Sequence, residues 1–66
     1  MSESAMRNYF EMLARKISVI YSVTIDSARN AVANSVIQDI ARKYPEHVGH
    51  VSITEWAEEV YTEMYI

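Results

Sequence analysis

The side chains best suited to metal binding or acid–base chemistry are two histidines beside a glutamate. His47 and His50 are spaced as H-x-x-H and directly follow Glu46. Imidazole nitrogens and carboxylate oxygens are common zinc ligands, but a stable site needs about four ligands and further hydrogen bonds that orient them. The chain has no cysteine to complete such a set. We therefore interpret both histidines as solvated loop residues and expect no metal.

Motifs for catalysis and for nucleotide binding are sparse. A histidine could activate one of the seven serines, but no serine lies in a strained turn of the kind that exposes a nucleophile. The single glycine, Gly49, excludes the glycine-rich loops that hold phosphates. We expect neither enzymatic activity nor a bound cofactor.

Carboxylates dominate the last third of the chain. Residues 1–45 carry six basic and four acidic side chains, whereas residues 46–66 carry five acidic and no basic ones. Such one-sided charge is typical of a surface that keeps a small protein soluble, or of one that binds a basic partner. Two tyrosines accompany the carboxylates, and tyrosine is enriched at protein interfaces. The predicted partner-binding residues are Glu55, Glu58, Glu59, Tyr61, Glu63 and Tyr65.

A second candidate surface combines amide and cationic side chains. On one helix, amides can read adenine edges in a major groove while arginine and lysine hold phosphates. The net charge of −3 is unfavourable for such a DNA reader. DNA binding in the manner of a helix-turn-helix protein is therefore the alternative function. Its candidate residues are Arg29, Asn30, Asn34, Gln38, Arg42 and Lys43.

Helices are the elements expected to position these side chains. Over residues 4–21, apolar residues recur at the i, i+3, i+4, i+7 spacing of a helix with one buried stripe. The segment Ile17–Ile25 also alternates apolar and small polar residues with the period of a strand. We predict that the helix ends near Tyr21. The alternative is that this segment pairs as a strand across a dimer.

Two further helices follow from capping chemistry. Thr24 is a good N-cap for a helix over residues 25–44, and Pro45 disfavours helical geometry in the residue before it. After a loop over residues 46–51, Ser52-Ile53-Thr54-Glu55 matches the capping box and predicts a helix over residues 53–65. The predicted fold is all-α, a small three-helix bundle forming a single domain over residues 1–66.

The size and composition of the chain indicate its class. A chain of 66 residues buries only roughly 60% of its unfolded surface, which makes homodimer formation a candidate source of stability. The amino-terminal residues are too polar for a signal peptide, and no apolar stretch is long enough for a membrane span, so we expect a cytoplasmic protein. The predicted function is a small acidic protein-interaction module. We expect it to act as a regulator, an adaptor or a stoichiometric inhibitor. An inhibitor encoded by a mobile element is one such form.

Overall fold

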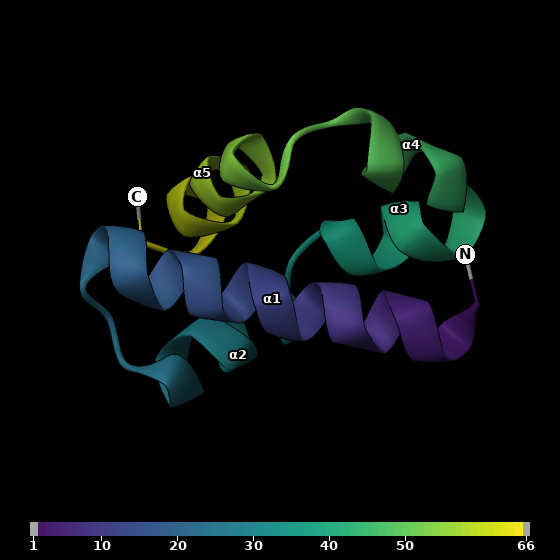
Figure 1. Ribbon diagram of the computed structural model, residues 1–66. Coiled ribbons are helices and arrows are strands. Elements are labelled where there is room, and N and C mark those ends of the chain that lie inside the picture. Colours follow the sequence, from purple (N-terminus) through teal and green to yellow (C-terminus); the bar gives the residue numbers. More distant parts are fainter. Residues whose placement is uncertain (1, 66) are drawn as a thin grey trace.

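The longest helix runs the length of the molecule. The computed structural model describes residues 2–65, and α1 (Glu3–Tyr21) crosses the whole fold (Figure 1). Its 19 residues span about 28 Å, close to the longest dimension of 29 Å. The Ser2 hydroxyl accepts a hydrogen bond from the Ala5 amide at 3.1 Å and caps the start. Ser22, with a left-handed φ of 55°, ends the helix.

The segment with a strand-like pattern is helical as far as Tyr21. Ile17 is fully buried within α1, and no strand occurs in residues 2–65. The Ser18 hydroxyl donates to the Val23 carbonyl oxygen at 2.6 Å and holds the connection to the next helix. The strand alternative for residues 17–25 is therefore wrong, and the predicted helix end is confirmed.

The predicted second helix is two helices. These are α2 (Ile25–Ala33) and α3 (Ile37–Lys43). Thr24 is the N-cap of α2, as predicted, and its hydroxyl accepts an amide hydrogen bond from the first turn. The chain leaves the regular helix over residues 34–36, so the prediction of one helix over residues 25–44 is wrong. The cause is a contact from a distant part of the chain, described below.

A short helix occupies most of the predicted loop. α4 spans Pro45–His50, with the proline in its first turn. Proline lacks an amide hydrogen and has a fixed φ, so it ends a preceding helix and also suits the first turn of a new one. The sequence prediction used only the first property, and the loop predicted over residues 46–51 is wrong.

The last helix begins where the capping box places it. In α5 (Ile53–Tyr65), the Ser52 hydroxyl accepts a hydrogen bond from the Glu55 amide at 3.1 Å. The indole nitrogen of Trp56 donates to the backbone oxygen of Val48 at 3.0 Å, which fastens α4 to α5. Capping thus sets the start of α5, and a buried aromatic side chain sets the position of α4.

One hydrophobic core joins the five helices described over residues 2–65. α1 packs against α2 and α5, while α3 packs against α4 (Figure 1). The radius of gyration is 10.8 Å, and about 10.8 Å is expected for a compact chain of this length. The fold is all-α, as predicted, but it is not the three-helix bundle that was predicted. The large side chains that are fully buried are Leu13, Ile17, Ile37, Val48 and Val60.

Candidate functional site

Three glutamates lie together on the outward side of α5. Glu55, Glu58 and Glu59 are exposed, whereas Trp56 and Val60 on the other side are buried. We call these three residues the acidic face. None of them forms an ion pair with any residue of the described chain, 2–65. Like charges one helical turn apart destabilise a helix by about 0.2–0.5 kcal/mol, so the acidic face is slightly unfavourable for folding.

The acidic side chains of the first three helices are arranged differently, because each contacts an arginine. The Glu11 carboxylate accepts hydrogen bonds from two nitrogens of Arg29, at 2.9 and 2.7 Å. This pairing, with Arg15 also nearby, holds the pKa of Glu11 below its ordinary value of 4.5. Among residues 2–65, the carboxylates without an ion pair are therefore those of α5 and Glu46 of α4. The other pairs are Glu3 with Arg7, Asp26 with Arg29, and Asp39 with Arg42.

Glu63, also predicted to bind a partner, instead contacts the break between α2 and α3. Its carboxylate accepts hydrogen bonds from the Ser35 hydroxyl and the Val36 amide, both at 2.8 Å. Ser35 is 5% exposed, and its hydroxyl oxygen lies 3.2 Å from the Ile37 amide nitrogen, from which it accepts a hydrogen bond. We call this arrangement the Glu63 clasp. It provides acceptors for the amides of Val36 and Ile37 at the start of α3 and thereby stabilises the break over residues 34–36.

The sequence around the serine of the clasp resembles a capping box but does not form the contacts of one. Ser35 and Gln38 have the S-x-x-Q spacing of a capping box, but α3 has Val36 as its N-cap, and the Gln38 side chain donates to the Val32 carbonyl oxygen instead. The regular apolar spacing across residues 25–44 favours one continuous helix there. The Glu63 partner has no local signal, because it lies 28 residues further along the chain.

The two predicted interface tyrosines fasten α5 to the neighbouring helices. The Tyr61 ring stacks on Tyr21 of α1, with centroids 3.9 Å apart and planes 6° apart. Tyr65 stacks on Tyr61 at 4.9 Å, and its hydroxyl contacts the Ser27 hydroxyl of α2. Tyr65 remains 42% exposed. Tyr61 is therefore mainly a packing residue, while Tyr65 still offers a surface to a partner.

The residues of the alternative DNA-binding site are divided by the break. The Asn34 amide group donates to the Asn30 carbonyl oxygen at 2.8 Å, and that of Gln38 donates to the Val32 carbonyl oxygen at 2.9 Å. The side-chain amides of Asn34 and Gln38 therefore bind nearby backbone carbonyl oxygens and do not form one row along a single helix. Arg29 and Arg42 each contact a carboxylate, as described above. Lys43 lies exposed in the last turn of α3.

The histidines lie on α4 rather than in a loop. The ring of His47 meets Trp56 edge to face, with centroids 5.9 Å apart, and His50 is exposed at the end of the helix. Across residues 2–65, no group of three or more acidic or histidine side chains is placed to hold a metal ion. The geometry thus does not assemble Glu46 and the two histidines into a metal site.

Similarity to known proteins does not identify the role of the acidic face. None of the helices described over residues 2–65 combines the length and apolar character needed to cross a membrane. Comparison with protein families, with curated proteins and with solved structures gives no match to this chain.

Proposed function

We propose that the chain is a small helical protein-interaction module that binds a basic partner through its acidic face. The observation that carries this proposal is the absence of any ion pair to Glu55, Glu58 or Glu59 within residues 2–65, whereas the acids of α1, α2 and α3 pair with arginines. Lysine or arginine side chains of a partner would supply the missing charge. Electrostatic complementarity of this kind speeds association and selects partners.

The proposed role is binding rather than catalysis. The candidate general bases, His47 and His50, are exposed on α4. General acid–base catalysis needs a base held within hydrogen-bond reach of the group that it deprotonates. A regulator, an adaptor or a stoichiometric inhibitor that blocks the basic groove of a nucleic-acid-binding protein fits a small acidic domain. We place this activity in the cytoplasm, since the chain has no cysteine for disulfide bonds.

An affinity capture from the native host tests the proposal. The tagged chain would be used as bait at low and at high salt, with and without nuclease. We expect a basic protein that is retained after nuclease treatment and lost at high salt, because exposed charge pairs are screened. Recovery that depends on nucleic acid would contradict the proposal and favour DNA binding through residues 25–44.

Homodimer formation remains a separate prediction. α1 leaves three large apolar side chains exposed, Met12 at 59%, Val19 at 80% and Ile20 at 44%. Exposed apolar side chains near one another are typical of association surfaces. Sedimentation velocity should show a dimer at micromolar concentration, and a monomer throughout that range would contradict it.

A further inference from the structure

A hollow of about 300 Å³ opens where α3, α4 and α5 meet. Val36 and Ile40 line it from the α3 side, and Glu55 and Glu59 line it from α5. We call it the α3–α5 hollow. Its volume is at the lower end of the range for ligand pockets, so it suits one or two side chains of a partner.

Two tertiary contacts hold the walls of the hollow in place. The Glu63 clasp ties the start of α3 to α5, because the Val36 amide donates to the Glu63 carboxylate at 2.8 Å. The Trp56 indole donates to the Val48 carbonyl oxygen at 3.0 Å and so holds α4 against α5. The hollow is therefore formed before a ligand binds, which lowers the entropic cost of binding.

The hollow combines apolar surface with two carboxylates. Val36, Ile40 and Trp56 supply aliphatic and aromatic surface, and the Val36 side chain is still 43% exposed. Glu55 and Glu59 are exposed and lie one turn apart on α5, a spacing that places Cβ atoms about 5–6 Å apart. A ligand that fits this site therefore has an apolar portion that ends in a cation.

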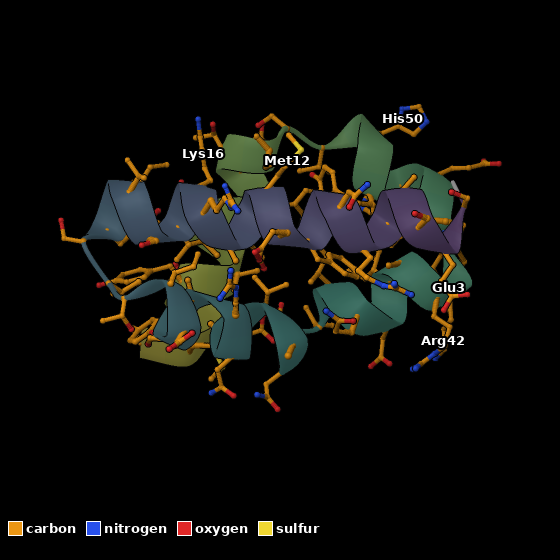
Figure 2. All side chains as sticks on the ribbon, turned by 60° about the horizontal axis from the view of Figure 1, so that its bottom comes forward. Glu3, Met12, Lys16, Arg42 and His50 are labelled. Carbon is orange, nitrogen blue, oxygen red and sulfur yellow. The ribbon has the colours of Figure 1, made fainter. Side chains whose placement is uncertain are left out.

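The chain does not supply that cation from any residue in the range 2–65. Neither Glu55 nor Glu59 takes part in an ion pair, and every arginine pairs with a carboxylate of α1, α2 or α3. The two lysines do not line the hollow, and Figure 2 shows Lys16 extending outward from α1. His47 lines the hollow, but its ring meets Trp56 edge to face. Unpaired negative charge thus lies beside apolar surface.

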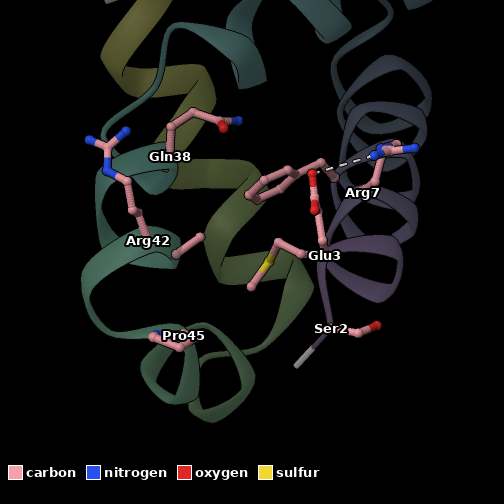
Figure 3. Close-up of a pocket in the computed structure, with 9 residues that line it drawn as sticks. Ser2, Glu3, Arg7, Gln38, Arg42 and Pro45 are labelled. Carbon is pink, nitrogen blue, oxygen red and sulfur yellow. Dashed lines mark ion pairs between the residues drawn. The ribbon is translucent and has the colours of Figure 1, made fainter.

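A larger hollow elsewhere in the fold lacks this property. It has a volume of about 590 Å³, and Figure 3 shows Arg7 and Arg42 on its walls. Arg7 pairs with Glu3, and Arg42 pairs with Asp39. Because its cations already have partners, that hollow has no charge that would select a ligand. Unpaired carboxylates distinguish the α3–α5 hollow from it.

We propose that the α3–α5 hollow receives an arginine side chain of the basic partner. This inference rests on the proposed function and names the group that the acidic face recognises. The methylene groups of the arginine cover Val36 and Ile40, since long cationic side chains lay their apolar stems along apolar surface. The guanidinium then reaches the carboxylates at the edge of the hollow.

The paired carboxylates favour arginine over lysine. A guanidinium is planar and has five N–H donors, so it can donate to Glu55 and Glu59 at once. A lysine ammonium is more compact and more strongly hydrated, and it is harder to remove from water. Glu58 belongs to the acidic face but does not line the hollow. The three glutamates of the acidic face therefore have unequal roles.

Three short capped peptides test the proposal. They differ only in the central residue, which is arginine, lysine or citrulline, the uncharged analogue of arginine, with a leucine on either side. Each is titrated into the isotopically labelled 66-residue chain, and NMR follows the backbone amides and the indole N–H of Trp56, the only tryptophan. The arginine peptide should shift the Trp56 indole and the Ile40 and Glu59 amides in a saturable manner. The lysine peptide should bind at least about threefold more weakly, and the citrulline peptide should not bind.

Glutamine variants with a matched control locate the contact. Glu55→Gln with Glu59→Gln removes both charged acceptors and should weaken binding of the arginine peptide at least about fivefold. Glu46→Gln with Glu58→Gln makes the same change in net charge at exposed, unpaired carboxylates outside the hollow. This control should weaken binding less than about twofold.

A second pair of variants fills the hollow without a change in charge. Val36→Phe places a larger side chain in the hollow and should block the arginine peptide. Val19→Phe makes the same substitution on α1, where the valine is 80% exposed, and should leave binding unchanged. Thermal unfolding of each variant checks that it is folded.

Four results would overturn the arginine site. These are no shift of the Trp56 indole at millimolar arginine peptide, equal binding of the citrulline peptide, equal binding of the lysine peptide, and equal weakening by the two pairs of glutamine variants. The proposed function fails on a different result, an unchanged affinity for a captured partner when all three glutamates of the acidic face are neutralised. If the Trp56 indole shifts on concentrating the chain alone, a second copy occupies the hollow, and that finding also replaces the partner's arginine.

Discussion

Glu59 and Glu63 lie one turn apart on α5, yet their carboxylates have different surroundings. Glu59 belongs to the acidic face and pairs with no cation among residues 2–65. Glu63 accepts two hydrogen bonds at the break between α2 and α3. Residue type and helix spacing are the same for both, so only the three-dimensional fold separates a surface charge from a structural one.

Glu63→Ala should destabilise the fold. The substitution leaves the buried Ser35 hydroxyl and the Val36 amide without their charged acceptor, at a cost of about 1–3 kcal/mol. Urea denaturation measures the change. Glu59→Ala, on the same helix, is the control and should change the free energy of unfolding by less than about 0.5 kcal/mol. Equal effects of the two substitutions would contradict the Glu63 clasp.

Tyr9→Phe should stabilise the fold. The Tyr9 hydroxyl oxygen is buried and has no hydrogen-bond partner within residues 2–65, and this burial also raises the pKa of Tyr9. Removing an unsatisfied buried hydroxyl avoids a desolvation cost of about 1 kcal/mol. Thermal unfolding should show a higher Tm. A loss of stability would mean that the hydroxyl has a partner after all.

Stability should fall in acid partly through Glu11. Because pairing with Arg29 lowers the pKa of Glu11 in the folded chain, the pair stabilises the fold above the ordinary glutamate pKa. That contribution is lost as the pH falls through the lowered pKa. Between about pH 5 and pH 3, Tm should therefore change less with pH for Glu11→Gln than for the parent chain. The same dependence of Tm on pH in both would show that the pair adds nothing to stability.

At the scale of elements, the predictions that held depend on chemistry close in the sequence. Thr24 and Ser52 cap the helices that follow them, as their positions next to apolar periodic segments indicate. One prediction that failed, a single helix over residues 25–44, needed knowledge of Glu63, a partner far along the chain. The same limit applies to the site. The acidic face can be read from residue types, but the removal of Glu63 from it cannot.

The short helix α4 illustrates the same dependence on a distant residue. It has six residues, too few for a stable isolated helix, and the Trp56 indole of α5 holds it through the Val48 carbonyl oxygen. Its position therefore depends on tertiary contact rather than on helix propensity.

Trp56→Phe should loosen α4 before the other helices. The substitution leaves the Val48 carbonyl oxygen without its donor and removes part of the buried ring, at a cost of about 1–3 kcal/mol. Hydrogen exchange of the amides in residues 45–50 should become faster, while exchange in α1 changes less. A uniform increase across all helices would contradict a separate attachment of α4.

At the scale of the whole molecule, charge is divided between two surfaces. The carboxylates of α1, α2 and α3 pair with arginines, whereas the acidic face of α5 has no cation within residues 2–65. A chain this short has little surplus stability, so like charges kept adjacent on one helix imply a use for them. We propose that this use is the binding of a basic partner.

The affinity of a captured partner for a neutralised acidic face is the most direct test of this account. Calorimetry would compare the parent chain with the triple variant Glu55→Gln, Glu58→Gln and Glu59→Gln. The control removes three paired carboxylates elsewhere, Glu3→Gln, Asp26→Asn and Asp39→Asn, and so has the same net charge. We predict at least about tenfold weaker binding for the triple variant and less than about twofold for the control. Equal affinity of the parent chain and the triple variant would contradict the proposed function.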